Sequence, residues 1–148
     1  MSFHTGASQA MVHTILSLVM AKSISDASLI GASVQRLGDF FLMADKDFAT
    51  ATACYHTALE QMKNDGARRH VADCVLRLGI VLLLEGKVGK AKRKVTNSRR
   101  IYELAADAQG CSYCEGILAE CEVEGPKVSS TATPSLRILI DSSVRCSI

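Results

Sequence analysis

The sequence is poor in proline and aromatic residues and has no tryptophan. Its two prolines, Pro126 and Pro134, both follow residue 125, and aromatic residues make up only 5% of the 148 residues. Because proline interrupts helices, its absence from residues 1–125 favours long helices over strands. Apolar residues form 48% of the chain, which is enough to bury a core.

A large excess of charge is also missing. The chain has 17 lysines and arginines against 15 acidic residues, a net charge of +2, which does not demand a nucleic acid or a membrane surface as partner. The apolar run from Val12 to Ala21 has no lysine or arginine before it and is too short to span a bilayer. Six cysteines without a secretory signal indicate thiols in a reducing compartment, so we expect a cytoplasmic protein.

A repeat of about forty residues runs through the chain. Leu37-Gly38 recurs as Leu78-Gly79, and more weakly as Leu118-Ala119, at spacings of 41 and 40 residues. Three alanines, Ala10, Ala51 and Ala91, each precede the next of these leucines by 27 residues. Acidic turn residues recur as well, at Asp26, Asp65 and Asp107.

Between these markers the apolar residues recur every three or four positions, as in Val71, Val75, Leu78 and Leu82, which is the period of a helix. Short polar turns separate the helical stretches. The pattern predicts helices over residues 10–24, 28–43, 47–63, 67–84, 88–106 and 109–124. Each repeat is thus a pair of antiparallel helices, and its small residues allow two helix axes to approach closely.

The residues Leu37-Gly38, Phe41, Ala51, Tyr55 and Ala58 resemble the pattern of the tetratricopeptide repeat. The second repeat keeps Leu78-Gly79, Leu82, Ala91 and Val95 but has Ser98 in place of alanine. With its forty-residue period, the chain most resembles the tetratricopeptide arrays of fungal NACHT-type signalling ATPases. It contains no phosphate-binding loop of the Walker type.

This resemblance implies an all-α fold, an α-solenoid of about six helices in antiparallel hairpins that forms a right-handed superhelix. We expect a flexible N-terminus over residues 1–9, a repeat domain over 10–124 (a half repeat, two full repeats and a half repeat), and a flexible Ser/Thr/Pro-containing tail over 125–148. The open ends of the array could pair with another copy or with a longer array.

The same resemblance implies a concave groove lined by the first helix of each pair, which would bind a peptide or helix of another protein. The residues carried over to this groove by alignment are Gln35, Asp39, Leu42, Leu76, Ile80, Leu83, Tyr113 and Glu120. The first hypothesis for function is therefore a protein-protein interaction scaffold, whose partner the sequence does not identify.

A run of basic residues without an acidic one stands out between residues 87 and 100. It consists of Lys87, Lys90, Lys92, Arg93, Lys94, Arg99 and Arg100. These residues form either a solvated helix face or a patch for polyanions. No aromatic residue is interleaved with them, so stacking on nucleic-acid bases is not supported and a nucleic-acid partner is not expected.

Cys111 and Cys114 form a C-x-x-C pair, with Cys121 and Cys146 further along the chain. A small zinc-binding regulator is therefore an alternative, although no second C-x-x-C pair is present. Cys114 also occupies the repeat position of Ser33 and Cys74, which favours a buried thiol, and we expect no metal and no cofactor. A further alternative is a non-functional fragment of a larger repeat protein.

Nothing in the sequence indicates catalysis. The four histidines, His4, His13, His56 and His70, stand apart from any serine, cysteine or carboxylate in a nucleophile motif. We expect a protein that is not an enzyme.

Overall fold

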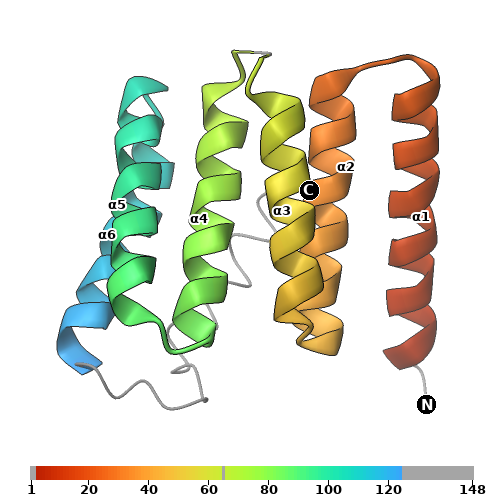
Figure 1. Ribbon diagram of the computed structural model, residues 1–148. Coiled ribbons are helices and arrows are strands. Elements are labelled where there is room, and N and C mark those ends of the chain that lie inside the picture. The colour runs from red at the N-terminus through yellow and green to blue at the C-terminus, as the bar shows by residue number, and fades with distance from the viewer. Residues whose placement is uncertain (1–2, 65, 125–148) are drawn as a thin grey trace. The chain divides into compact units, whose positions relative to one another are not determined.

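The computed structural model describes residues 3–64 and 66–124, and within them the chain is all α-helical (Figure 1). The helices are α1 (Phe3–Ser23), α2 (Ala27–Phe40), α3 (Phe48–Met62), α4 (Arg68–Leu84), α5 (Val88–Leu104) and α6 (Ala108–Glu124), with a π-helical turn η1 (Phe41–Asp45) after α2. Contacts join mostly sequential neighbours: α1 to α2, α2 to α3, α4 to α5, and α5 to α6. The predicted all-α class is confirmed.

The predicted helices agree with the observed ones to within two or three residues, apart from the start of the first. α1 begins at Phe3, so residues 3–9, which fall in the segment expected to be flexible, are helical. Gly6 and Ser8 are weak helix formers. Adding residues to a helix that already exists requires far less free energy than nucleating a new one, so the helix extends through them. The tail expected over 125–148 lies outside the described residues.

The chain divides into two compact units, and the first contains α1, α2 and α3. α3 buries one face, made of Ala51, Tyr55, Ala58 and Met62. Gly38 makes this packing possible, because a Cβ atom there would lie 2.8 Å from the ring of Tyr55 and 3.0 Å from Cβ of Cys54. The close approach of α2 and α3 therefore depends on the small residue of the Leu-Gly pair.

The second unit contains α4, α5 and α6. α5 buries Ala91, Val95, Ser98 and Tyr102. The hydroxyl of Ser98 donates to the carbonyl of Ala72 on α4 at 2.8 Å, so the serine that departs from the family pattern is satisfied in the core. The hydroxyl of Tyr102 donates to Asp73 on α4, and burial is the main cause that raises the pKa of Tyr102.

The forty-residue repeat is visible inside both units. From Ala51 to Met62 and from Ala91 to Tyr102, the order of buried, half-buried and exposed residues is identical position by position. The turns repeat as well: left-handed backbone occurs at Ser25, Gly66 and Ala106 before each first helix. Lys46 and Gly86 take the same conformation before α3 and α5.

Two of the predicted acidic turn residues begin helices as N-caps. Asp26 accepts a hydrogen bond from the backbone N–H of Leu29 at 3.0 Å, and Asp107 accepts one from Gly110 at 2.9 Å. Asp47 caps α3 in the same way through Thr50, and the pKa of Asp47 is lowered mainly because the Thr50 hydroxyl also donates to it. Asp65 lies outside the described residues.

The contact at Gly79 generates a prediction. A Cβ atom at Gly79 would lie 2.9 Å from Cγ2 of Val95, a buried β-branched side chain that cannot turn away easily. We expect Gly79→Ala to lower the free energy of unfolding by about 1–3 kcal/mol, measured by urea denaturation. The control is Gly89→Ala, at an exposed position of α5 where nothing lies within 4 Å of the added Cβ atom. We expect the free energy of unfolding to change by at most about 1 kcal/mol, in the stabilising direction. Equal effects at both sites would contradict this account of the helix contact.

Candidate binding surfaces

The residues assigned to the groove are mostly buried. Gln35 and Asp39 on α2 and Leu42 in η1 are 4–5% exposed, and Leu76, Ile80 and Leu83 on α4 are 1–2% exposed. Tyr113 and Glu120 on α6 are half-buried. The assignment of these residues to a binding groove stays a prediction, and its two accessible members are on α6.

Asp39 links two helices, a role that the sequence did not indicate. Its carboxylate accepts a hydrogen bond of 2.7 Å from the hydroxyl of Tyr55, so a predicted groove residue of α2 is tied to the core face of α3. In the second unit the Tyr102 hydroxyl and Asp73 make a similar link between α5 and α4. Buried tyrosine hydroxyls need such partners, and each pair fixes the alignment of two helices.

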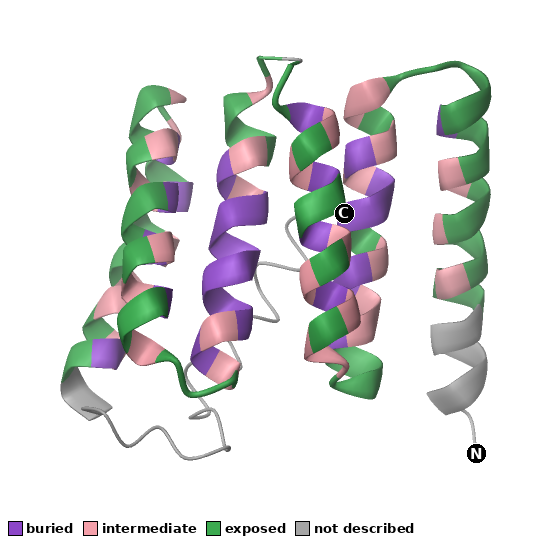
Figure 2. Ribbon diagram, viewed as in Figure 1, coloured by how far each residue is buried: buried purple, intermediate pink, exposed green. Residues whose placement is uncertain are grey.

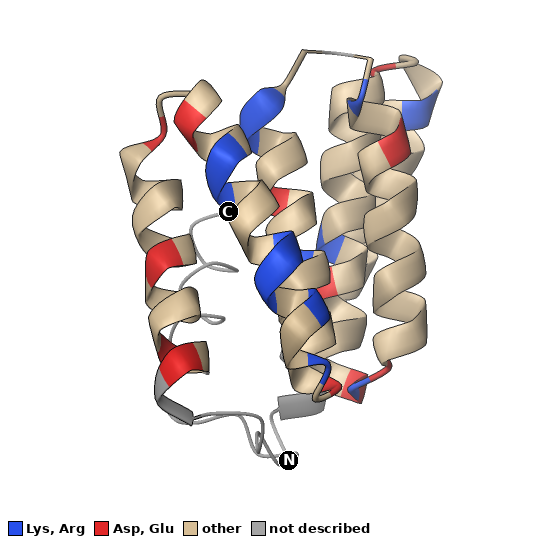
Figure 3. Ribbon diagram, turned by 60° about the vertical axis from the view of Figure 1, so that its left-hand side comes forward, with Lys and Arg blue, Asp and Glu red and all other residues tan. Residues whose placement is uncertain are grey.

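The basic residues lie along α5 and the turn before it, as Figure 3 shows. Three of the seven form ion pairs: Lys87 with Glu85 at 2.5 Å, Lys92 with Glu122 at 2.6 Å, and Arg99 with Glu115 at 2.9 Å. Arg99 also contacts Glu103 at 3.2 Å, and the hydrogen bond to Glu115 is the main cause that raises the pKa of Arg99. Two of these acidic partners, Glu115 and Glu122, come from α6, so part of the basic patch is paired with α6.

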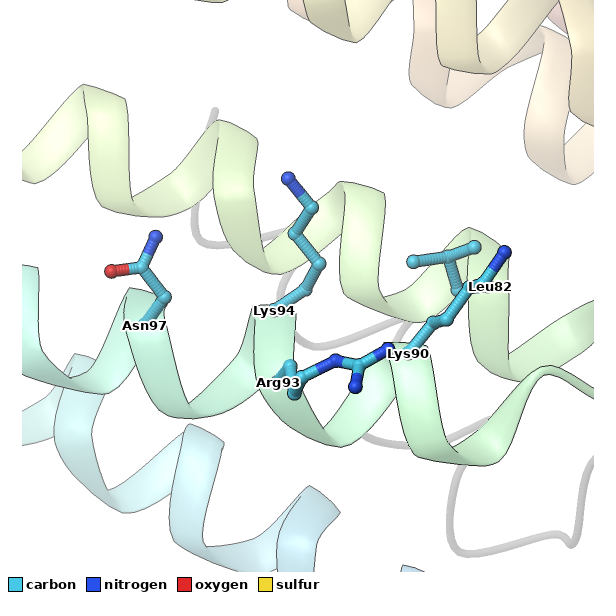
Figure 4. Close-up of a pocket in the computed structure, with 5 residues that line it drawn as sticks. All are labelled: Leu82, Lys90, Arg93, Lys94 and Asn97. Atoms are coloured by element: carbon cyan, nitrogen blue, oxygen red, sulfur yellow. The ribbon is translucent and has the colours of Figure 1, made fainter.

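The other four cations form no ion pair in the part of the chain that the structure describes. They are Lys90, Arg93, Lys94 and Arg100. An open pocket of about 340 Å³ is lined by three of these cations, Lys90, Arg93 and Lys94, together with Asn97 and Leu82 (Figure 4). In the figure the cations and Asn97 rise from α5, and Leu82 comes from α4. The pocket therefore joins unpaired positive charge, an amide and an aliphatic side chain.

Two residues of this pocket, Asn97 and Leu82, were not predicted. Asn97 follows Arg93 by four residues and Lys94 by three, so helical spacing could have placed it beside them. Leu82 belongs to the neighbouring helix and was assigned to the helix-packing pattern. Only the packing of α5 on α4 brings it to the cations.

The cysteines of the C-x-x-C pair lie between α5 and α6. The thiol of Cys114 is 3.8 Å from the hydroxyl of Ser98, and the thiol of Cys111 is 3.8 Å from the carbonyl oxygen of Arg99. The three residues at the repeat position of Cys114, namely Ser33, Cys74 and Cys114, are all buried, as predicted. Within the described residues no three or more His, Cys, Asp or Glu side chains form a group that could hold a metal ion, while Cys146 lies outside them.

Several large apolar side chains are exposed on α1 and just after it. Val12, Ile15, Leu16, Val19, Met20 and Ile24 keep between 42% and 68% of their surface exposed. The repeat predicts a stacked helix of the array in this stretch, and α1 does pack on α2, with Ala21 buried. The exposure of its other side was not predicted.

Among the described helices, none combines the length and the hydropathy that crossing a bilayer requires. Comparison with known proteins does not identify a family: no protein-family model, no curated protein and no solved structure matches the chain.

The burial of Cys114 predicts a difference in reactivity within the C-x-x-C pair. Burial raises the pKa of the Cys114 thiol to about 11, so almost none of it is thiolate at pH 8, whereas Cys111 is half-buried. We expect iodoacetamide at pH 8 to modify Cys111 faster than Cys114 by about tenfold or more, measured by peptide mass spectrometry. In denaturant the two rates should become similar. Rapid modification of Cys114 in the folded chain would show that the thiol is not enclosed as described.

Proposed function

We propose that this chain is a protein-interaction scaffold, built as an α-solenoid of tetratricopeptide-like hairpins. The observation that carries the proposal is the recurrence of one helix pair: α3 and α5 share the same order of burial, and the turns before each first helix share the same backbone conformation. A solenoid is built from such identical units, each of which buries its core against its neighbours. The buried thiols of Cys74, Cys114 and Cys121 act as small core residues, which supports a cytoplasmic location.

In such a scaffold the first helices of the pairs supply the binding surface. Of the residues assigned to it, Tyr113 and Glu120 on α6 are the ones that a partner could contact without displacing a buried side chain. A tyrosine offers a large, fairly rigid contact area and a polar hydroxyl, which is why this residue type is frequent at binding hot spots.

This proposal predicts a specific loss of binding. Peptides selected from a random peptide library on the purified full chain should bind Tyr113→Ala and Glu120→Lys at least about tenfold more weakly, as measured by fluorescence polarisation. The matched control is Ser112→Ala, an exposed residue of the same helix, which should bind within about twofold of the natural chain. Helix content by circular dichroism should be equal in all variants. If the selected peptides bind all variants alike, the α6 surface is not the binding site.

Glutamate substitutions at Leu76 or Ile80 are unsuitable for this test. Both side chains are at most 2% exposed, so a carboxylate there would lose its hydration without gaining a partner. The expected result is unfolding, whatever the groove binds.

The pocket on α5 favours a second candidate function, the binding of an acidic segment. Lys90, Arg93 and Lys94 project unpaired positive charge around the aliphatic side chain of Leu82, and Asn97 adds a hydrogen-bonding amide. Nucleic-acid bases would need an aromatic platform, and none lines this pocket. An acidic peptide with one apolar side chain matches both the positive charge of the pocket and the aliphatic side chain of Leu82.

The prediction for this pocket uses a fluorescent glutamate-rich peptide with one central leucine. We expect Arg93→Gln and Lys94→Gln together to weaken its binding by about tenfold or more and to make the binding less sensitive to salt. Lys92→Gln is the control, because Lys92 lies on the same helix but is paired with Glu122, and its loss should change the affinity by less than about threefold. Replacing the leucine of the peptide by glycine should weaken binding to the natural chain. Equal losses in the control and the pocket variant would reveal a nonspecific effect of net charge.

A further inference from the structure

The repeat provides a common register for α1, α3 and α5, which Ala10, Ala51 and Ala91 define. In this register four positions of α3 point away from its packed face: Ala53, His56, Thr57 and Glu60, all exposed. The same four positions of α5 are Arg93, Thr96, Asn97 and Arg100, again all exposed. In both helices, most of these outward residues are polar or charged, as a solvated face requires.

On α1 the same four positions are all apolar. They are Val12, Ile15, Leu16 and Val19, with 54%, 42%, 53% and 59% of their surface exposed. Met20 and Ile24 extend the apolar surface toward the end of the helix, at 68% and 65% exposure. Figure 2 shows exposed and half-buried residues over most of the described part of α1. We call this set of six residues, five on α1 and Ile24 just after it, the outer face of α1.

A preceding helix of the array would not cover this face. In the second helix of each pair, two residues lie against the glycine of the first helix. Cys54 and Tyr55 of α3 lie against Gly38 of α2, and Lys94 and Val95 of α5 lie against Gly79 of α4. The corresponding residues of α1 are His13 and Thr14. An added helix would therefore contact His13 and Thr14 and leave Val12, Ile15, Leu16 and Val19 exposed, like their equivalents.

Charge narrows the choice of partner. Lys22 is the only lysine, arginine or acidic residue between Phe3 and Ser23. An anionic membrane surface recruits helices that carry several cations on the polar face, and α1 lacks them. The outer face carries no charged group that could pair with a charged partner protein. An uncharged apolar helix fits best, and α1 is itself such a helix.

The size of the face suits a dimer. The exposed fractions leave on the order of 500–600 Å² of apolar surface, as large as the largest apolar patch on a typical monomer. A standard interface buries roughly 800 Å² on each partner. The outer face and the residues around it approach this area. Two-fold symmetry is also the commonest way for a chain to bind itself.

We propose that the outer face of α1 is the interface of a homodimer, in which α1 packs antiparallel to α1 of a second copy with Leu16 near the two-fold axis. An antiparallel pair separates the two Lys22 side chains, whereas a parallel pair would place them together. It also sets the two helix dipoles in opposite directions. Val12 of each copy then lies beside Met20 of the other. The dimer does not depend on whether α5 or α6 binds a peptide.

The test is the mass of the full chain in solution, measured by sedimentation and by light scattering over a range of concentrations. The natural chain should be a dimer with dissociation in the micromolar range or tighter. Leu16→Glu should weaken the dimer at least about 100-fold, because it brings two carboxylates together in an apolar contact. Thr57→Glu, which introduces the same residue at the equivalent position of α3, should leave the dimer intact. Equal helix content of the variants shows that folding is unaffected, and Val19→Lys serves as a second disrupting variant.

A mixture of Leu16→Glu and Leu16→Lys distinguishes self-pairing at this residue from a general loss of apolar surface. Each variant alone should be monomeric, and the mixture should form a heterodimer at least about tenfold tighter than either alone. A monomeric natural chain would overturn the proposal, whether or not it binds vesicles of anionic phospholipid. A natural dimer that survives Leu16→Glu, or a mixture that stays monomeric, would overturn it too.

Discussion

The close approach of the two helices of a pair is the constraint on which the rest of this structure depends. At Gly38 and at Gly79 the neighbouring helix lies so near that a single added carbon would overlap a tyrosine ring or a valine methyl group. This approach sets which residues of α3 and α5 become buried, and it brings Tyr55 within 2.7 Å of Asp39. It also fixes the register from which the outward residues follow, including the cations of α5.

The basic run shows how one sequence feature can serve two purposes. Lys92 and Arg99 contact acidic side chains of α6 and so contribute to packing. Lys90, Arg93 and Lys94 surround Leu82 and form no ion pair with any described residue. Exposed ion pairs contribute little to stability, and an unpaired group of cations near an aliphatic side chain is better suited to a ligand than to folding.

α1 is the exception among the second helices of the pairs. Of the four positions that α3 and α5 bury, α1 buries only Ala21, and it has apolar residues where α3 and α5 are solvated. A monomer would expose this face to water at a considerable cost in solubility. The difference between α1 and its equivalents is therefore evidence of a contact, because the repeat itself needs polar residues there.

The sequence by itself determined the helices apart from the start of α1, the forty-residue period, the turns at Asp26 and Asp107, and the burial of Ala51, Ala91 and Cys114, since all of these follow from local spacing and residue type. Tertiary structure alone decided which of the outward faces are covered and which are open. Leu76 and Ile80 were assigned to a groove but are buried, while Leu16 and Val19 were assigned to a stack but are exposed. Periodicity identifies the faces of a helix but not the neighbour that covers each one. The same reason separates Lys92 from Lys94, because the acidic partner of Lys92 lies thirty residues away on another helix.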